Sequence, residues 1–323
     1  MLPEVDVVVI DGLNIFSRHY EANPAMSGDG QQVGGFVGTL STIRELINLV
    51  HPRRVIVAWE GGGSKRRRSI DKDYKKGRAP RLEGLNRYYD DIPDTLENRN
   101  FQLANLINFL RTTPVEQIYA QDAEADDAIA YVIGSMPEAR FLIASSDRDM
   151  YQLIEDGRVA VWTPGRRKFV TEKECLAEFR IHPTNFALAK AIVGDVGDNV
   201  KGVKGCGWKY LARWAPGLST SETVYMSDLL SSLGSLNETK RSKTIENILA
   251  SKDKISKNLR LVSLSASSLP HQAARRIDNQ LESGPGSLPG KLDMMRYFIK
   301  EKLQLVDADS LHAAFRILAR GSR

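Results

Sequence analysis

The 323-residue sequence has few of the residues that build covalent or zinc-based frameworks. It contains two cysteines, Cys175 and Cys206, and five histidines that are scattered along the chain. Two cysteines exclude both a network of disulfides and a cysteine-zinc cluster. Stability must therefore come from an ordinary hydrophobic core, and a chain of this length is able to bury one.

Long hydrophobic runs are also missing. The longest apolar runs are short pieces such as residues 7–10, far below the roughly 20 residues that a membrane span needs. Asp6 and Asp11 bracket that run, so it does not have the pattern of a signal peptide. We expect a cytoplasmic protein of a reducing compartment that has no membrane partner.

The net charge is only +5, but the basic residues are unevenly distributed. Between residues 65 and 81, nine lysines and arginines stand against two acids, Asp71 and Asp73. Such a local excess is typical of a surface that binds a polyanion. A solvated basic loop without a partner is the alternative.

Strand-like and helix-like segments alternate over the first half of the chain. Strands are predicted at residues 5–10, 54–59, 117–120, 140–144 and 159–163, and helices at residues 36–50, 96–111 and 123–133. This alternation predicts an α/β fold with a mostly parallel central sheet and helices on both faces.

The second half has a different pattern. Helical periodicity dominates from residue 185 to about 264, interrupted by a glycine-punctuated stretch at residues 194–207. Residues 265–290 are rich in Ser, Pro and Gly, which predicts a linker. Two further helices are predicted at residues 292–303 and 309–318.

Acidic residues follow three of the predicted strands directly, namely Asp11, Glu60 and Asp147. The carboxyl ends of parallel strands lie along one edge, where open α/β folds bind their ligands. Further acids fall at the same edge or in the glycine-punctuated stretch: Glu124, Asp126, Asp127, Asp149, Asp195 and Asp198. Taken singly, each fits a turn or a helix cap.

Together these acids predict a cation site. Two carboxylates about 4 Å apart repel by about 4 kcal/mol at an effective dielectric constant of 20. Ligand sets made only of oxygen favour Mg²⁺, Mn²⁺ or Ca²⁺ over zinc. A carboxylate cluster beside a basic segment is what metal-assisted hydrolysis of a phosphodiester requires.

Five motifs in this order resemble the flap endonuclease family, the 5′-nucleases of phages and of the N-terminal part of bacterial DNA polymerase I. They are Val9-Ile10-Asp11-Gly12, Tyr74-Lys75-x-x-Arg78, Ala123-Glu124-Ala125-Asp126-Asp127, Ser146-Asp147-x-Asp149 and Gly194-Asp195-x-x-Asp198-Asn199. The resemblance extends from about residue 5 to 265. A polymerase does not fit in this length, so the chain resembles a stand-alone, phage-type enzyme of the host cytoplasm.

The resemblance implies a PIN-like nuclease core that holds two or more Mg²⁺ ions, with Mn²⁺ as an alternative. Asp11, Glu124, Asp126 and Asp127 would hold the first ion, and Asp147, Asp149, Asp195 and Asp198 the second. Glu60 stands where the family usually has Asp, so its ligand role is open. Lys75 and Arg78 would contact the scissile phosphate and, with Asp126, form the catalytic set.

The resemblance also implies a DNA-binding surface in two parts. Around a helical arch it would use Arg66, Arg67, Arg68, Tyr74 and Lys76; Tyr74 either stacks on a base or packs at the foot of the arch. A helix-hairpin-helix would grip duplex DNA with Lys201, Gly202, Lys204, Gly205, Gly207 and Lys209, with K⁺ bound there. Gly205 and Gly207 allow a tight turn whose backbone N–H groups approach a phosphate.

We therefore predict a monomeric, Mg²⁺-dependent 5′-3′ exonuclease or flap endonuclease that acts on DNA with a 5′ flap or a 5′ end at a duplex junction. Its expected parts are a nuclease core at residues 1–193 with the arch at about 64–111, a helix-hairpin-helix domain at 194–264, and a linker with C-terminal helices at 265–323. Two alternatives remain, a related PIN-like ribonuclease and a non-catalytic protein that binds branched DNA.

Overall fold

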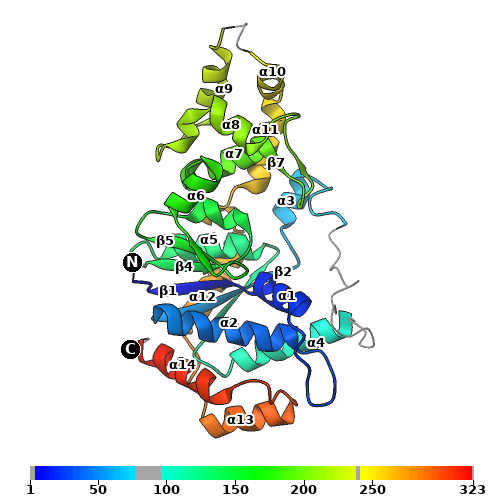
Figure 1. Cartoon of the computed structure of the whole chain (residues 1–323), viewed down its shortest axis with the longest axis vertical. Helices are drawn as coiled ribbons and strands as arrows, with labels where there is room; N and C mark the ends of the chain where they lie inside the picture. Colours follow the sequence, from blue (N-terminus) through cyan, green and yellow to red (C-terminus); the bar gives the residue numbers. More distant parts are fainter. Residues whose placement is uncertain (1–3, 78–95, 238–240, 322–323) are drawn as a thin grey trace.

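The computed structural model describes residues 4–77, 96–237 and 241–321. Its centre is a six-stranded sheet in the order β3-β2-β1-β4-β5-β6 (Figure 1). The strands are β1 (Val7–Asp11), β2 (Arg54–Gly61), β3 (Glu116–Gln121), β4 (Phe141–Ala144), β5 (Val159–Thr163) and β6 (Lys168–Val170). The first five strands run parallel and β6 is antiparallel to β5. The predicted mostly parallel sheet is confirmed.

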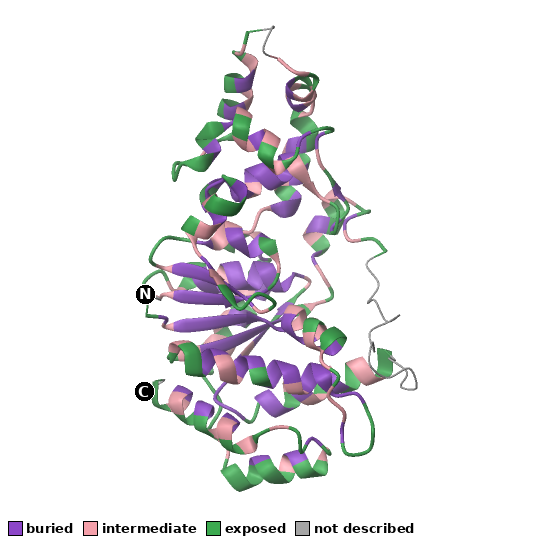
Figure 2. Cartoon of the chain, viewed as in Figure 1, coloured by how far each residue is buried: buried purple, intermediate pink, exposed green. Residues whose placement is uncertain are grey.

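Both faces of the sheet are buried, as its β-branched strands require (Figure 2). Successive residues of a strand point to opposite faces, and β1 accordingly contributes Val8 and Ile10 to one hydrophobic core and Val7 and Val9 to the other. The first core is covered by α1 (Gly12–Ala22), α2 (Gly34–Val50) and α4 (Leu96–Leu110), and the second by α5 (Ala125–Ser135). The helices on both faces are confirmed.

The C-terminal part packs on the sheet and its helices. It consists of α12 (His271–Glu282), α13 (Lys291–Lys300) and α14 (Ala308–Gly321). The expectation of a linker over residues 265–290 is wrong for α12, which lies against β3. Ala273 and Ile277 are four residues apart and both buried, so a short apolar stripe holds this otherwise polar helix in place.

A helical part extends from the other side of the sheet, at the top of Figure 1. It contains α6 (Glu172–Phe179), α7 (Phe186–Val193), the hairpin β7 (Gly194–Asp195) and β8 (Val200–Lys201), α8 (Trp208–Trp214), α9 (Met226–Gly234), α10 (Lys243–Ala250) and α11 (Lys252–Val262). Residues 202–207, which were predicted to form the hairpin of a helix-hairpin-helix, lie between β8 and α8. α11 returns to pack on α7 and on α3 (Lys65–Ile70), which connects the helical part to the foot of the predicted arch. None of the described helices is both long and apolar enough to cross a membrane.

Candidate metal centre and nucleic-acid interface

The predicted acids gather at the carboxyl edge of the sheet. Asp11 ends β1, Glu60 lies next to the end of β2, Glu124 caps α5 directly after β3, and Asp147 follows β4. The strand order reverses at β1, because β2 and β3 lie on one side of it and β4 and β5 on the other. Open α/β sheets bind their ligands at this kind of position.

Two groups of carboxylates are close enough to share a cation. Asp126, Asp147 and Asp149 form the first group, and Asp149, Asp195 and Asp198 form the second. In each group, one oxygen per residue lies within 4.8 Å of the others. The donor atoms are carboxylate oxygens throughout, so the groups fit a hard divalent ion such as Mg²⁺ or Mn²⁺. Within the described residues, the other predicted ligands lie outside both groups: Asp11, Glu60, Glu124 and Asp127.

Burial and mutual repulsion shift the acids at the centre toward their protonated forms. Burial, together with the charges of Asp147 and Glu60, raises the pKa of Asp11 to about 7. The hydrogen bonds that Asp11 accepts act to lower this pKa but do not outweigh burial. Burial and the charges of Asp147 and Asp11 likewise raise the pKa of Asp126. A bound cation removes this repulsion, so the site is built for a positively charged occupant.

Two polar residues that sequence reasoning missed hold Asp11 in position. The backbone N–H of Asn14 donates to Oδ1 of Asp11 at 3.2 Å, and the Ser145 hydroxyl donates to Oδ2 at 3.1 Å. The Ser145 hydroxyl also accepts from the N–H of Asp147 at 3.0 Å. Ser145 therefore fixes the acids of two neighbouring strands relative to each other. It directly follows β4, and that position was the available signal.

Lys75 lies among the acids. Its Nζ is 2.9 Å from Oε2 of Glu124 and 3.8 Å from Oδ2 of Asp198. Burial acts to lower the pKa of Lys75, but the charges of Glu124 and Asp198 outweigh it and raise that pKa. The ammonium therefore stays charged at the edge where the acids meet.

Tyr74 is buried beside the acids. The side chain is buried, and its hydroxyl oxygen lies 3.2 Å from Oε2 of Glu124 and 3.1 Å from Oδ2 of Asp198. Of the two predicted alternatives, stacking on a terminal base is wrong because the ring has no exposed face in this structure.

Arg67 is buried as well, so its predicted DNA contact is wrong. Its side chain is 1 % exposed, and Nη1 lies 2.6 Å from Oδ2 of Asp127 and 2.9 Å from Oε2 of Glu124. Its Nε donates to the carbonyl of Leu261 at 2.7 Å. One guanidinium thus joins α3, the start of α5 and the end of α11, and it occupies the Asp127 carboxylate that was predicted to hold metal.

Residues 73–76 of the basic stretch are hydrogen-bonded to the turn that carries Asp195 and Asp198. The arch predicted at about 64–111 includes residues 78–95, which lie outside the described residues. The N–H of Lys75 donates to the backbone carbonyl of Asp198 at 3.1 Å. The Asn199 side chain donates to the carbonyls of Asp73 and Lys76, at 3.1 and 2.8 Å. A segment from the basic stretch and a segment from the second half of the chain therefore form one surface.

A buried lysine, which sequence reasoning did not single out, contacts the second group of acids. Lys190 lies on α7, with Nζ 2.6 Å from Oδ2 of Asp195 and in contact with Oδ1 of Asp149. α7 reads Phe-Ala-Leu-Ala-Lys-Ala-Ile-Val, so a single charge in an apolar helix was the signal that pointed to it.

Comparison with known proteins identifies the family. Residues 6–180 match the model of the 5′-3′ exonuclease N-terminal resolvase-like domain. The chain is 30 % identical over 229 residues to a flap endonuclease Xni of Shewanella sp. (strain MR-4), which covers 70 % of this chain and 80 % of the relative. The chain belongs to the flap endonuclease and 5′-3′ exonuclease family. Another flap endonuclease Xni, from Shewanella sp. (strain W3-18-1), is 28 % identical and is covered to 97 % of its length.

Solved structures show the same fold for this flap endonuclease homologue. The phage T5 D15 protein co-crystallised with metal ions superposes with a TM-score of 0.67 at 23 % identity, over 86 % of this chain and 98 % of that one. The T5 5′-exonuclease with bound divalent zinc ions gives a TM-score of 0.69 at 22 % identity, over the same shares of the two chains. These superpositions confirm the predicted fold, and the family model and the relatives confirm the family resemblance.

The predicted DNA-binding residues of this flap endonuclease homologue differ in accessibility. Those at the surface are Arg68, Lys76, Lys201, Lys204, Gly205, Gly207 and Lys209, whereas Arg66 and Gly202 are half-buried. Arg66 donates to the carbonyl of Arg260 at 3.1 Å. Arg78 lies outside the described residues.

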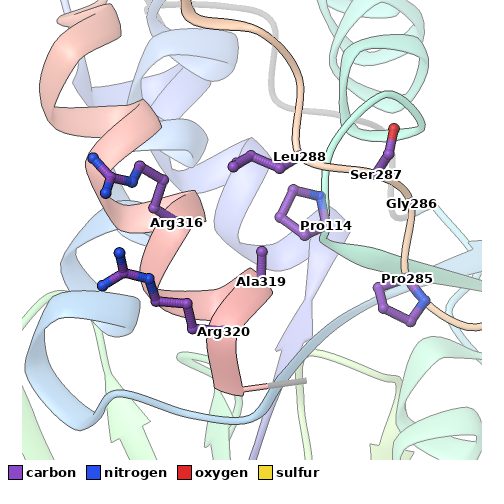
Figure 3. Close-up of a pocket in the computed structure, with 8 residues that line it drawn as sticks. All are labelled: Pro114, Pro285, Gly286, Ser287, Leu288, Arg316, Ala319 and Arg320. Carbon is purple, nitrogen blue, oxygen red and sulfur yellow. The ribbon is translucent and has the colours of Figure 1, made fainter. Parts of the chain in front are cut away.

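A pocket lies on the other side of the sheet from the acidic edge. Figure 3 shows a pocket of about 470 Å³ that α14 forms with Pro114 and residues 285–288. Pro114 precedes β3 and Arg320 lies near the end of α14, so the pocket is at the amino ends of the strands. The acids meet at the opposite edge of the sheet.

Proposed function

We propose that this chain, a structure-specific 5′-nuclease of the flap endonuclease family, hydrolyses DNA phosphodiesters beside the junction of a 5′ single strand and a duplex. The observation that carries the proposal is the position of the Lys75 ammonium, which pairs with Glu124 and lies 3.8 Å from Asp198. Asp198 belongs to one of the two carboxylate groups that share Asp149. Carboxylates alone would repel a phosphate, so this edge accepts DNA only when cations neutralise it.

The groups around Asp149 are proposed to hold two Mg²⁺ ions, with Mn²⁺ as a substitute. When bound, such ions lower the pKa of a coordinated water and neutralise the attacking and leaving oxygens of the phosphodiester. Asp126 and Asp147 would belong to one ion and Asp195 and Asp198 to the other, consistent with the two groups. Asp11, held by Ser145 and Asn14, would act on the first ion through its waters.

Lys75 is proposed to contact the scissile phosphate. Its ammonium is charged, partly exposed and already oriented by Glu124 and Asp198, so it can bind an incoming phosphate oxygen without reorganising. Arg78 follows it in the sequence and is proposed to act beside it. The charge that builds up on the phosphate in the transition state would be stabilised by both.

The α7–β7–β8–α8 segment is proposed to grip the duplex. Lys201, Lys204 and Lys209 are exposed along it and can neutralise phosphates without reading the base sequence. Gly205 has a φ of 83°, a backbone conformation that favours glycine. The exposed backbone around it is proposed to contact a phosphate or a K⁺ ion. The division into a core at 1–193, a DNA-binding domain at 194–264 and a C-terminal part at 265–323 stays a proposal, as does the monomeric state.

The test is cleavage of a 5′-labelled flap DNA by the purified protein in Mg²⁺, in Mn²⁺ and in EDTA. Asp126→Asn removes one acid of the first group, and Asp293→Asn on α13 is the matched control because that acid is exposed and far along the chain from the site. We expect short 5′ products that need a divalent ion, that disappear in Asp126→Asn and that persist in Asp293→Asn.

Other outcomes would contradict this proposal in distinct ways. Cleavage restricted to an RNA version of the same flap would favour the PIN-like ribonuclease. Tight DNA binding without cleavage in either metal, unchanged or stronger in Asp126→Asn, would favour a non-catalytic protein that binds branched DNA.

A further inference from the structure

The second acidic group already contains a positive charge from the protein itself. The Lys190 side chain is 8 % exposed, and its ammonium forms ion pairs with both Asp149 and Asp195. These two acids, with Asp198, place one oxygen each within 4.8 Å of the others. Lys190 therefore lies where a divalent ion of the second group would have to bind.

A buried ammonium needs close partners, and clustered carboxylates need a cation. Lys190 comes from the middle of α7, whose other residues are apolar, and α7 is packed against α11 and α8. The helix therefore cannot slide to withdraw the charge. Only the flexible four-carbon side chain can move when another cation arrives.

The pKa of Asp195 shows how strongly its carboxylate interacts with the Lys190 ammonium. Burial acts to raise the pKa of Asp195, but the charge and hydrogen bond of Lys190 outweigh it and lower that pKa. The carboxylate is thus kept ionised and oriented without metal. A divalent ion gains a prepared set of ligands, but it must displace the ammonium to use them fully.

We propose that Lys190 is the resident counter-ion of the Asp149, Asp195 and Asp198 group and competes with the divalent ion that binds there. This inference rests on the proposed metal-dependent function. It assigns Lys190 a positioning role: the residue holds the acids together in the free protein and makes the second ion the more weakly bound one. Lys190 contacts the first group only through Asp149, so it weakens the binding of a divalent ion there less.

The test measures metal binding and stability, with no DNA and no turnover. Mn²⁺ binding is followed by electron paramagnetic resonance of the free ion, and thermal unfolding is recorded in EDTA and in Mn²⁺. The variants are Lys190→Met, which removes the charge at similar length, and Lys190→Arg, which keeps it. Lys302→Met is the matched control, because Lys302 pairs with Asp29 at 2.8 Å near the end of α13.

We expect Lys190→Met to bind the weaker Mn²⁺ ion roughly ten- to hundredfold more tightly, the range by which residues around a metal site change affinity. In EDTA its unfolding midpoint should fall, and Mn²⁺ should raise the midpoint by more than it does in the wild type. Lys190→Arg should retain the weak binding of the wild type, and Lys302→Met should behave as the wild type in both assays.

Three results would overturn the proposal. Unchanged affinity in Lys190→Met would mean that the ammonium does not compete, and weaker binding would mean that it helps to hold the ion. A variant that stays unfolded even in Mn²⁺, with Lys190→Gln giving the same result, would make Lys190 a purely structural residue. If the wild type binds no Mn²⁺ at all, the proposed function itself fails, and the two failures are thereby distinguished.

Discussion

Arg67 and Asp127 form a two-point ion pair inside the protein. Nη1 of Arg67 lies 2.6 Å from Oδ2 of Asp127, and Nη2 lies 2.8 Å from Oδ1. Parallel N–H···O bonds of this kind fix direction as well as distance. The pair connects the foot of the arch to the helix that carries Asp126, so the basic segment and the acidic edge are held in one arrangement.

Replacement of Arg67 by methionine should destabilise the protein by about 3–5 kcal/mol, because it leaves the buried Asp127 carboxylate without its partner. The measurement is urea unfolding followed by circular dichroism. Arg68→Met is the matched control, since Arg68 is the adjacent residue and is exposed. Equal stability of the two variants would mean that the ion pair is not the link between α3 and α5.

Lys75→Met should reduce the rate of flap cleavage by about 10²–10³-fold, the usual loss when one oriented donor to a transition-state charge is removed. The loss should fall mainly on kcat, because the surface lysines that bind the duplex are unchanged. Lys76→Met is the control: Lys76 is exposed and pairs with Asp73 at 3.0 Å. Single-turnover kinetics separate cleavage from binding, and a loss confined to KM would assign Lys75 to binding only.

The metal-free protein should become less stable as the pH rises from about 4 to about 7. The pKa of Asp11 is about 7 in the fold against 3.8 for the unperturbed group, so the folded state binds more protons than the unfolded state in this window. Stability from the protonated Asp11 is therefore complete below pH 4 and is lost through pH 7. Unfolding in EDTA at a series of pH values checks this.

Asp11→Asn provides the comparison for that pH series, because the amide has the shape of the acid but no charge to gain. Its stability should change less than that of the wild type between pH 4 and 7, and Mg²⁺ should weaken the dependence in the wild type. Parallel curves for the two proteins in EDTA would assign the pH dependence to other groups, of which Asp126 is the nearest candidate.

Lys204→Met should weaken binding to duplex DNA and lower the slope of log K against log salt concentration by about one, as expected for the loss of one phosphate contact. Fluorescence anisotropy with two unrelated duplex sequences measures both effects, which should be equal for the two sequences. Lys300→Met is the control, because this exposed lysine lies at the end of α13. A change that depends on sequence would contradict a grip on the backbone alone.

Gly202→Ala should strongly destabilise the hairpin, whereas Gly207→Ala should be tolerated. A methyl group on Gly202 would overlap the carbonyl of Val193, while one on Gly207 would meet no atom within 4 Å. The two glycines lie in the same short segment. Comparing the two variants therefore separates the effect of steric crowding by the new methyl group from the effect of losing a glycine. Thermal unfolding together with duplex binding is the measurement, and equal behaviour of the variants would disprove the close backbone approach.

The acidic edge was predictable because it depends on local patterns and one topological rule. Asp11 and Glu60 lie at the carboxyl ends of β1 and β2, Asp147 follows β4, and parallel strands bring their carboxyl ends to the same edge. Helix α12 was not predicted, since its Ser-, Pro- and Gly-rich flanks outweighed the spacing of Ala273 and Ile277.

The sequence by itself determined the parallel strands of the sheet, the edge on which the acids meet and the family to which the chain belongs, because periodicity and motif spacing are properties of short segments. Only the tertiary structure decided which basic groups are exposed and which contact the acids. Arg67 binds the carboxylate of Asp127, 60 residues away, and the carbonyl of Leu261, 194 residues away. Lys190 on α7 contacts Asp149, which lies in the segment after β4. Such pairings depend on how the chain packs. The residues that flank a charged side chain in a basic or apolar run do not indicate which distant residue it will contact.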